Sequence, residues 1–321
     1  MAEPHPDADA MIAIKAAEFV MGSDRHYPEE RPARRVRVDA FLIDRTPVTV
    51  SDFARFVAET GHVTLAEIAP DPRDYPGMPP ELARPGSIVF RQPAEIVGFS
   101  HMQWWDFVIG ANWRQPEGPG SSIEGRDDHP VTHVAHRDAA AFASWAGKAL
   151  PTEAEWELAA RGGLEGCDFA WGDEFEPDGQ LMANYWHGQF PVLNLMTDGF
   201  AGTSPVGAFP ANGFGLSDMI GNVWEWTDDW YLENGQTRQC CVPRNPRGGS
   251  LEASLERGQE HLGIGRKVLK GGSHLCAPNY CQRYRPAARL AQPIDTSTCH
   301  VGFRCVIRSD GDRSPGSARS R

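Results

Sequence analysis

Glycine and proline interrupt this sequence so often that long regular elements have little room to form. The 321 residues include 33 glycines and 26 prolines. That share exceeds the roughly 12% of an average protein and stays short of the roughly 25–30% typical of disordered chains. After residue 163, short aromatic segments alternate with Gly, Pro, Asn and Asp. This pattern predicts short strands joined by long ordered loops.

Three helices are predicted ahead of that region, each from a capping residue, an apolar face and a glycine stop. Two of them begin with a capping box, in which Thr49 pairs with Asp52 and Thr152 pairs with Glu155. The expected spans are Thr49 to about Thr60 before Gly61, Asp138 to Gly147, and Thr152 to Gly162. Few helices beside many short strands predict a loop-rich α+β fold.

Charge and hydropathy exclude several classes of function. The formal net charge is −12, which repels nucleic-acid backbones and anionic lipid surfaces. No apolar run approaches the roughly 18 residues of a membrane helix, and the first residues do not resemble a secretion signal. We therefore expect a cytoplasmic protein that binds neither nucleic acid nor membrane. We also expect a monomer, although the sequence does not determine the oligomeric state. One domain is predicted over residues 11–308, between disordered tails at 1–10 and 309–321.

The strongest local feature is a pair of cysteines, Cys276 and Cys281, within the segment KGGSHLCAPNYC. Thiolates are soft ligands that favour Cu(I), zinc or iron–sulfur clusters. A lone Cys-x4-Cys lacks the second ligand pair of a zinc knuckle, so it suits a two-coordinate Cu(I) ion or a reversible disulfide. Two small core residues or an incidental disulfide fit the spacing slightly better. Nearby, Ser273 and Tyr280 are candidates for positioning a substrate.

A second group of candidates is rich in oxygen donors. Asn184, Asp198, Asp218 and Glu225 each lie in a turn rich in Gly and aromatic residues. Calcium takes six to eight oxygen ligands, and loops supply carbonyls beside carboxylates. Asn and Asp side chains also cap ordinary turns, and spacing alone does not separate these two interpretations.

Other chemically capable residues have structural interpretations. His129, His133 and His136 have the spacing of a metal triad on a helix, but the Pro and β-branched residues between them favour a strand, which would scatter the rings. Cys305 is expected in a buried strand. The adjacent Cys240 and Cys241 could form a disulfide or have no chemical role. Cys167 and Cys299 have no evident partner in the sequence. Gly263 and Gly265 lack the rest of a nucleotide-binding motif.

Taken together, these stretches resemble the formylglycine-generating enzymes, the sulfatase-modifying factor family, over about residues 12–307. The shared stretches include FVMGS, HPVTHVAHRDAAAFASWAGKALPTEAEWELAARGG, FAWGDEF, DGFAGTSPVGAFPANGFGL and IGNVWEWTDDW. Most of them occur throughout a broad superfamily. The segment KGGSHLCAPNYCQRYRPAAR is more specific to the catalytic branch, and both cysteines are present here.

The resemblance implies a single domain with a C-type-lectin-like fold and an O2-dependent oxidase activity. Such an enzyme binds an unfolded or nascent sulfatase at a Cys-x-Pro-x-Arg motif and converts the cysteine to Cα-formylglycine. Matching onto the family gives Cys276 and Cys281 as the ligands of a Cu(I) ion, with the substrate thiol as a third. It also places Ser273, Trp224 and Tyr280 around the active site.

The resemblance further implies structural calcium at one or two sites. The first set is Asn184, the Tyr185 carbonyl, Asp198 and the Phe200 carbonyl; the second is Asp218, the Gly221 and Val223 carbonyls, and Glu225. Position 218 is Asn in some members, which puts the second site in doubt. Pro286 stands where secreted members have a disulfide cysteine, and His274 replaces an aromatic residue. The loop at 230–268 matches the family poorly.

Three other functions compete with this hypothesis. A lectin-like binding module would use the same fold and calcium without needing the cysteines. A relative with non-haem iron chemistry would need a separate helical bundle that bears histidine ligands, and there is no room for one before residue 12. A copper carrier would exchange metal without turnover. The intact cysteine segment favours the oxidase.

Overall fold

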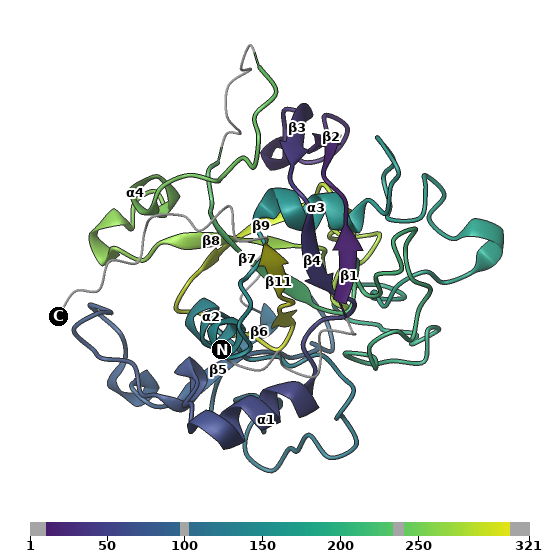
Figure 1. Cartoon of the computed structure of the whole chain (residues 1–321). Helices are drawn as coiled ribbons and strands as arrows, with labels where there is room; N and C mark the ends of the chain where they lie inside the picture. Colours follow the sequence, from purple (N-terminus) through teal and green to yellow (C-terminus); the bar gives the residue numbers. More distant parts are fainter. Residues whose placement is uncertain (1–10, 97–102, 234–240, 309–321) are drawn as a thin grey trace.

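A computed structural model describes residues 11–96, 103–233 and 241–308 of the chain (Figure 1). Within these ranges the helices are short, and much of the backbone runs in turns and loops. The α-helices are α1 (Val50–Thr60), α2 (His136–Trp145), α3 (Glu153–Ala160) and α4 (Leu251–Ser254). Short 3-10 turns lie at Pro28–Glu30, Leu65–Glu67, Pro80–Leu82, Pro177–Gly179 and Glu260–Leu262. The predicted loop-rich α+β architecture is confirmed.

The central sheet has four strands in the order β10-β7-β8-β9. Its strands are β7 (Trp224–Trp230), β8 (Arg266–Lys270), β9 (Arg289–Pro293) and β10 (Val301–Gly302). β8 and β9 are antiparallel, with Lys270 opposite Arg289 and Arg266 opposite Pro293. Residues 271–288, which contain both candidate cysteines, therefore form the loop of a β8–β9 hairpin. We call these residues the cysteine loop.

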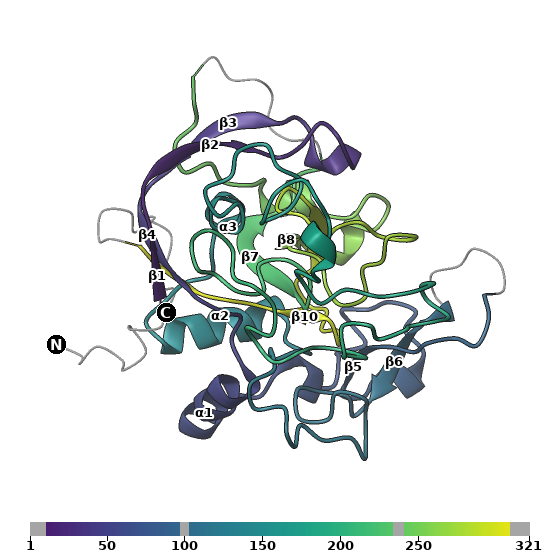
Figure 2. The same ribbon diagram turned by 90° about the vertical axis from the view of Figure 1, so that its right-hand side faces the viewer.

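A second sheet joins the two ends of the described chain. It has the order β1-β4-β11, from β1 (Met11–Ile14), β4 (Phe41–Asp44) and β11 (Val306–Arg308). The remaining strands form two hairpins, β2 (Ala17–Met21) with β3 (Arg34–Val38) and β5 (Gly86–Phe90) with β6 (Trp105–Ile109). Figure 2 shows β1 and β4 leading into β2 and β3 as one arch over α3 and β7.

The capping predictions hold for two helices and need correction for the third. Thr49 caps α1 by accepting the Asp52 N–H, and Thr152 caps α3 by accepting the Glu155 N–H. The second helix begins at His136 and its cap is Ala135, three residues before the predicted cap Asp138. Asp138 is its third residue, and its carboxylate reaches back to accept the Ala135 N–H at 2.9 Å. An acidic side chain at the third position of a helix can accept the N–H of the residue before the helix, for which the helix itself provides no acceptor.

The strand expected around the three histidines is absent from the described backbone there. Pro130 forms one isolated bridge with Thr49, and His133 has a φ of 59°, which interrupts an extended run. The rings face separate partners: His129 bonds the Thr203 hydroxyl, His133 bonds the Ser87 hydroxyl, and the His136 ring packs edge-on against Trp226. Burial lowers the pKa of His133 to about 3 and of His136 to about 4.

The remaining sequence predictions on structure have mixed outcomes. Cys305 is fully buried as predicted, but it lies one residue before β11. Cys299 accepts the Phe90 N–H at 3.2 Å. Cys240 and the predicted tails at 1–10 and 309–321 lie outside the described residues. None of the helices in the described ranges is long and apolar enough to span a bilayer.

Candidate active site

The cysteine loop begins with two glycines that no other residue type could replace without strain. Gly271 has a φ of +93° and Gly272 a φ of +74°, which favour residues without a Cβ. A Cβ on Gly271 would lie 2.9 Å from the Met219 carbonyl oxygen, and one on Gly272 would lie 2.9 Å from the Arg283 backbone. Both glycines are therefore packed against the protein's own backbone.

Cys276 and Cys281 lie next to each other, with 3.2 Å between their Sγ atoms and no disulfide. Backbone bonds fix both residues, because Cys276 N–H donates to the Ser273 carbonyl and Cys281 N–H donates to that of Ala277. Burial raises the pKa of Cys276, whereas the hydrogen bond from Cys276, aided by Arg283, lowers the pKa of Cys281 to about 6. Two thiol sulfurs this close together can bind the same metal ion, and such soft ligands fit Cu(I).

Arg283 ties the cysteine loop to the N-terminal part of the chain. Its guanidinium pairs with Glu29 and lies over the Tyr27 ring, 4.1 Å from the centroid. Arg285 makes a buried ion pair with Glu30. We call residues 27–30 the N-terminal brace. Sequence reasoning missed it, because the paired residues are more than 250 positions apart.

Aromatic side chains form a wall beside the cysteines. The Tyr280 ring, 43% exposed, stacks on Phe190 at 4.4 Å between centroids and meets Trp104 edge-on at 5.9 Å. The Trp186 N–H donates to the Cys276 carbonyl at 2.9 Å. Tyr280 was predicted from the sequence, whereas Phe190, Trp104 and Trp186 were not. Their signal in the sequence is the density of aromatic residues in loops, which does not reveal which loops meet.

Ser273 and Trp224, also predicted at the active site, lie in the protein interior. Ser273 is fully buried, and its hydroxyl accepts the Leu275 N–H at 3.2 Å. This bond shapes the turn that carries Cys276. Trp224 belongs to the same apolar core as Cys276. Among the described residues, no hydrogen bond or ring contact joins Trp224 to either cysteine.

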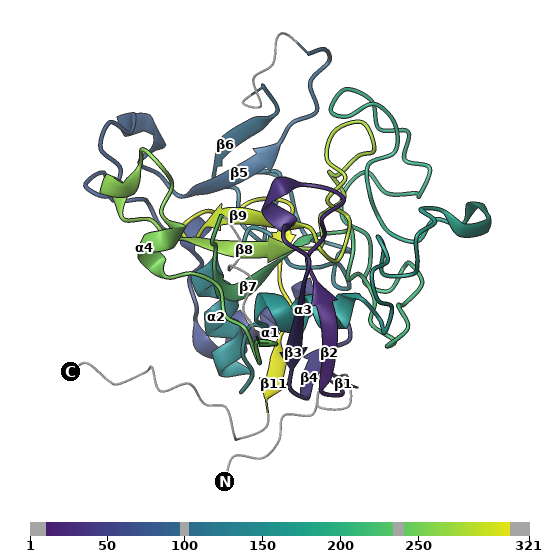
Figure 3. The same cartoon turned by 90° about the horizontal axis from the view of Figure 1, so that it is seen from above.

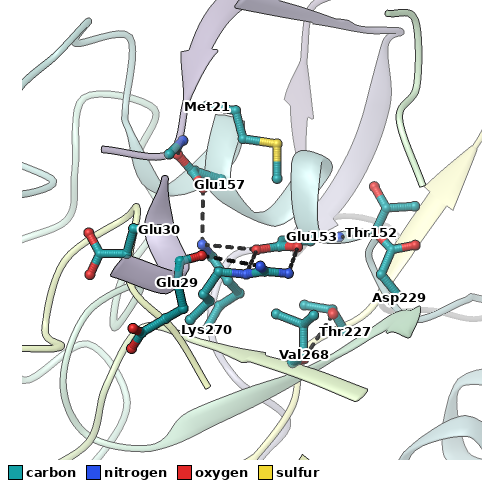
Figure 4. Close-up of polar contacts among 12 residues, drawn as sticks. Met21, Glu29, Glu30, Thr152, Glu153, Glu157, Thr227, Asp229, Val268 and Lys270 are labelled. Atoms are coloured by element: carbon teal, nitrogen blue, oxygen red, sulfur yellow. Dashed lines mark hydrogen bonds and ion pairs between the residues drawn. The ribbon is translucent and has the colours of Figure 1, made fainter. Parts of the chain in front are cut away.

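A buried ionic network fixes the two strand ends from which the cysteine loop emerges. Figure 4 shows Glu153 and Glu157 reaching from α3 toward Lys270 at the end of β8. The Lys270 Nζ lies 3.0 Å from Glu157 and 3.7 Å from Glu153. Arg289, the first residue of β9, donates twice to Glu153 at 2.8 and 2.9 Å. One carboxylate thus holds both sides of the hairpin, so α3 sets the position of the loop.

The first predicted calcium set combines buried oxygen donors from two loops. Its members are Asn184, Tyr185, Asp198 and Phe200. The Asn184 amide donates to the Gly202 carbonyl at 2.9 Å, which joins the two loops. The Asp198 Oδ2 is buried without a hydrogen-bond partner, 3.6 Å from the His187 Nε2. A buried carboxylate oxygen left without a partner fits a bound cation. Sequence reasoning did not include His187.

The second predicted set has its carboxylates engaged within the protein. Its members are Asp218, Gly221, Val223 and Glu225. Glu225 is fully buried and accepts from Arg304 at 2.7 and 2.8 Å and from the Trp156 indole at 2.8 Å. Asp218 accepts the Gly207 N–H at 2.7 Å. A calcium ion here would share Glu225 with Arg304.

Both sets adjoin the cysteine loop. The Gly221 N–H donates to the Gly271 carbonyl at 3.0 Å. His274 donates to the Asn222 carbonyl twice, through its backbone N–H at 3.0 Å and its ring at 2.8 Å. The Asn222 N–H in turn donates to the Asn184 carbonyl at 2.9 Å. The candidate calcium loops therefore form the support beneath Cys276.

Comparisons with known proteins show which family this chain is similar to. The family model described as "Sulfatase-modifying factor enzyme 1-like domain" matches residues 1–309. A formylglycine-generating enzyme of Mycobacterium tuberculosis is 50% identical, with 92% of this chain and 97% of the relative covered. One from Mus musculus is 44% identical over 92% of this chain and 74% of the relative. A mouse relative named an inactive Cα-formylglycine-generating enzyme 2 is 37% identical over 94% and 87% of the two chains.

Solved structures show the same fold at greater distance. The structure of PvdO from Pseudomonas aeruginosa superposes with a TM-score of 0.58 at 24% identity, covering 93% of this chain and 94% of that one. A family model that spans nearly the whole chain, and a relative identical at half of the aligned positions, establish the relationship. The chain belongs to the formylglycine-generating enzyme family.

Proposed function

We propose that this protein oxidises the cysteine of a Cys-x-Pro-x-Arg motif in a sulfatase to Cα-formylglycine, with O2 as the oxidant. The observation that supports this most is the pair of thiols 3.2 Å apart in the cysteine loop. Family membership with 50% identity to a named formylglycine-generating enzyme supports it independently. The family is copper-dependent, and Cys276 and Cys281 are the residues that would hold Cu(I). When bound there, copper would supply the redox chemistry with O2.

Residues of this chain would bind the peptide and orient it beside Cys276 and Cys281. The exposed edge of Tyr280, supported by Phe190 and Trp104, offers an apolar surface beside Cys281. The brace holds Arg283 against Cys281, where its positive charge favours the thiolate that a soft metal requires. The buried Cys276 is shielded from water by the core around it. This arrangement fits an unfolded sulfatase segment as substrate, and we propose that the protein acts as a monomer in the cytoplasm.

The direct test is oxidation of a synthetic Cys-x-Pro-x-Arg peptide in air by the copper-loaded protein. We expect the peptide to exchange sulfur for oxygen and lose two hydrogens, and the product to react with an aldehyde-specific hydrazide. Mass spectrometry of the peptide measures both changes. A peptide with serine in place of cysteine is the matched control. If the copper-loaded protein leaves the cysteine peptide unchanged, the proposed activity is wrong.

We also propose a structural calcium ion at the first set, where Asp198 has a buried oxygen that accepts no hydrogen bond from any described residue. A ligand that binds only the folded state stabilises it, by about 2.7 kcal/mol at a hundredfold excess over its Kd. We expect calcium to raise the urea midpoint of the wild type and to leave that of Asp198→Asn unchanged. Asp178→Asn, an exposed acid outside the set, should respond as the wild type does. Equal responses from Asp198→Asn and the wild type would contradict this site.

A further inference from the structure

One carboxylate at the base of the cysteine loop bonds to both of the strands that carry the loop. Glu153 accepts two hydrogen bonds from Arg289, at 2.8 and 2.9 Å. It also lies 3.7 Å from the Lys270 Nζ (Figure 4). The Glu153 N–H donates to Asp229 of β7 at 2.8 Å, which ties this end of α3 to the central sheet. Because Lys270 and Arg289 are opposite each other in the ladder, Glu153 fixes the point at which the loop opens.

Arg289 extends this constraint from α3 to the N-terminal brace. Its Nη1 donates to the Glu29 carbonyl at 3.2 Å and to the Leu232 carbonyl at 2.9 Å. Figure 3 shows the purple segment that contains the brace beside the ends of β8 and β9 nearest the cysteine loop. A guanidinium has its donors in one rigid plane, so its bonds to Glu153 also orient Nη1. The position of the Glu29 backbone therefore depends on the pair between Arg289 and Glu153.

The brace in turn contacts the residues that follow the second thiol. The Glu29 carboxylate pairs with Arg283, two positions after Cys281. The Tyr27 hydroxyl accepts the Gln282 N–H at 3.2 Å. Both contacts hold the backbone directly after Cys281, so a displacement of the brace would move this thiol.

The first thiol has a separate support. The Cys276 carbonyl accepts the Trp186 N–H at 2.9 Å, and the His274 N–H donates to the Asn222 carbonyl at 3.0 Å. Neither contact involves the brace. The distance of 3.2 Å between the two Sγ atoms therefore depends on how the two halves of the loop are held relative to each other. Glu153 bonds to the strand end on each side, so it is placed to control that distance.

We propose that Glu153 is a positioning residue for the oxidation: it acts through Arg289 and the brace to keep the two thiols of the cysteine loop close enough to bind one metal ion. The inference rests on the proposed function and deepens it, because it assigns the spacing of the thiols to a carboxylate outside the loop. Replacing a residue that orients metal ligands typically costs about 10- to 100-fold in metal affinity or activity. The turn that joins Ala277 to Cys281 remains without Glu153, so we expect the lower end of that range.

The test compares Glu153→Gln with the matched control Glu155→Gln. Glu155 lies on the same helix, is similarly buried, and accepts two hydrogen bonds from Arg308 at 2.7 and 2.6 Å. Arg308 belongs to β11, in the other sheet. We expect Glu153→Gln to lower both the Cu(I) affinity and the kcat of peptide oxidation about tenfold, with an unchanged KM. Glu155→Gln should keep the wild-type values. Competition with a Cu(I) chelator measures the affinity, and mass spectrometry of the peptide measures the rate.

A second measurement uses the metal-free protein. At equilibrium with glutathione, Cys276 and Cys281 form a disulfide by giving two hydrogens to one oxidised glutathione, which becomes two reduced molecules. The bond requires a specific placement of the two sulfurs. We expect the equilibrium constant to fall in Glu153→Gln by a factor similar to that for copper, and to stay unchanged in Glu155→Gln. Mass spectrometry of the proteolytic fragment that contains both cysteines gives this constant.

A milder variant, Arg289→Lys, tests the same route. Lysine keeps the buried positive charge opposite Glu153, but it lacks the planar fork that reaches Glu29 and Leu232 at the same time. It should lower the Cu(I) affinity and the disulfide equilibrium constant in the same direction as Glu153→Gln. If Glu153→Gln does not fold, these two measurements on Arg289→Lys decide the question.

The outcomes separate this inference from the proposed activity. Wild-type Cu(I) affinity and disulfide equilibrium in Glu153→Gln and Arg289→Lys would overturn the inference, even if the peptide is oxidised. Equal losses in Glu153→Gln and Glu155→Gln would show only a general loosening of α3 and would also overturn it. Neither quantity requires turnover, so both decide the inference even if the wild type oxidises no peptide.

Discussion

Replacing either Cys276 or Cys281 by serine should abolish formation of the aldehyde. The two Sγ atoms lie 3.2 Å apart, so each variant leaves a lone thiol where two soft donors would share one metal ion. Changes to residues that merely orient a metal ligand already cost about 10- to 100-fold in affinity or activity. Removal of a ligand itself should therefore reduce the rate of peptide oxidation by at least about a hundredfold. Mass spectrometry of the peptide gives the rate, and competition with a Cu(I) chelator gives the metal affinity.

The control for this experiment is Cys167→Ser. Cys167 is partly exposed, and its sulfur lies 4.0 Å from the Glu165 carbonyl and beside the Asp173 side chain. That variant should keep both the rate and the Cu(I) affinity of the wild type. Circular dichroism should show all three variants folded, because serine is smaller than cysteine and Cys281 is not fully buried. Undiminished aldehyde from either active-site variant would show that the paired thiols are not the reaction centre.

The second large effect is expected from Arg304→Met, which removes the cation beside Glu225. Arg304 is fully buried, and its guanidinium also donates to the carbonyls of Ser217 and Asp218. Breaking a buried ion pair by removing one partner costs about 3–5 kcal/mol, because the other charge remains in the interior. We expect a loss of that size in the free energy of unfolding, measured by urea denaturation in the presence of a calcium chelator.

Two further variants test the cause of that loss. Arg35→Met removes an ion pair with Glu165 in which both side chains are about half exposed, so it should cost no more than about 1 kcal/mol. The double variant Arg304→Met with Glu225→Gln should recover part of the loss, since the side chain at position 225 then carries no charge. A loss from Arg304→Met no larger than that from Arg35→Met would refute the buried ion pair as a main support of this region.

Local features of the fold could be predicted because they depend on neighbours in the sequence. The capping boxes at Thr49 and Thr152 satisfy backbone groups within three residues, so their geometry follows from the residue types alone. Asp138 shows the limit of this reasoning. An acid can cap a helix from its start or from its third residue, and both arrangements have the same residue pattern.

The candidate site was predictable only where the sequence brings its residues close together. Cys276 and Cys281 are five positions apart, and one turn brings them into contact. The brace was missed because Glu29 and Arg283 are separated by 254 positions. A cavity of about 610 Å³ was missed for the same reason, because its wall segments near residues 70, 107, 260 and 295 meet only in the folded chain. Apolar and acidic residues in such loops have no sequence period that would indicate a shared wall.

The sheet that joins β1, β4 and β11 has a consequence for when the enzyme can first work. Its last strand, Val306–Arg308, is synthesised long after its partners, which lie between Met11 and Asp44. The brace likewise waits for Arg283 and Arg285, which follow it by more than 250 positions. Contacts between such distant segments form late and slow folding. The cysteine loop therefore gains its final support only after residues 283–308 have left the ribosome, so we expect no activity from a nascent chain that stops before Arg308.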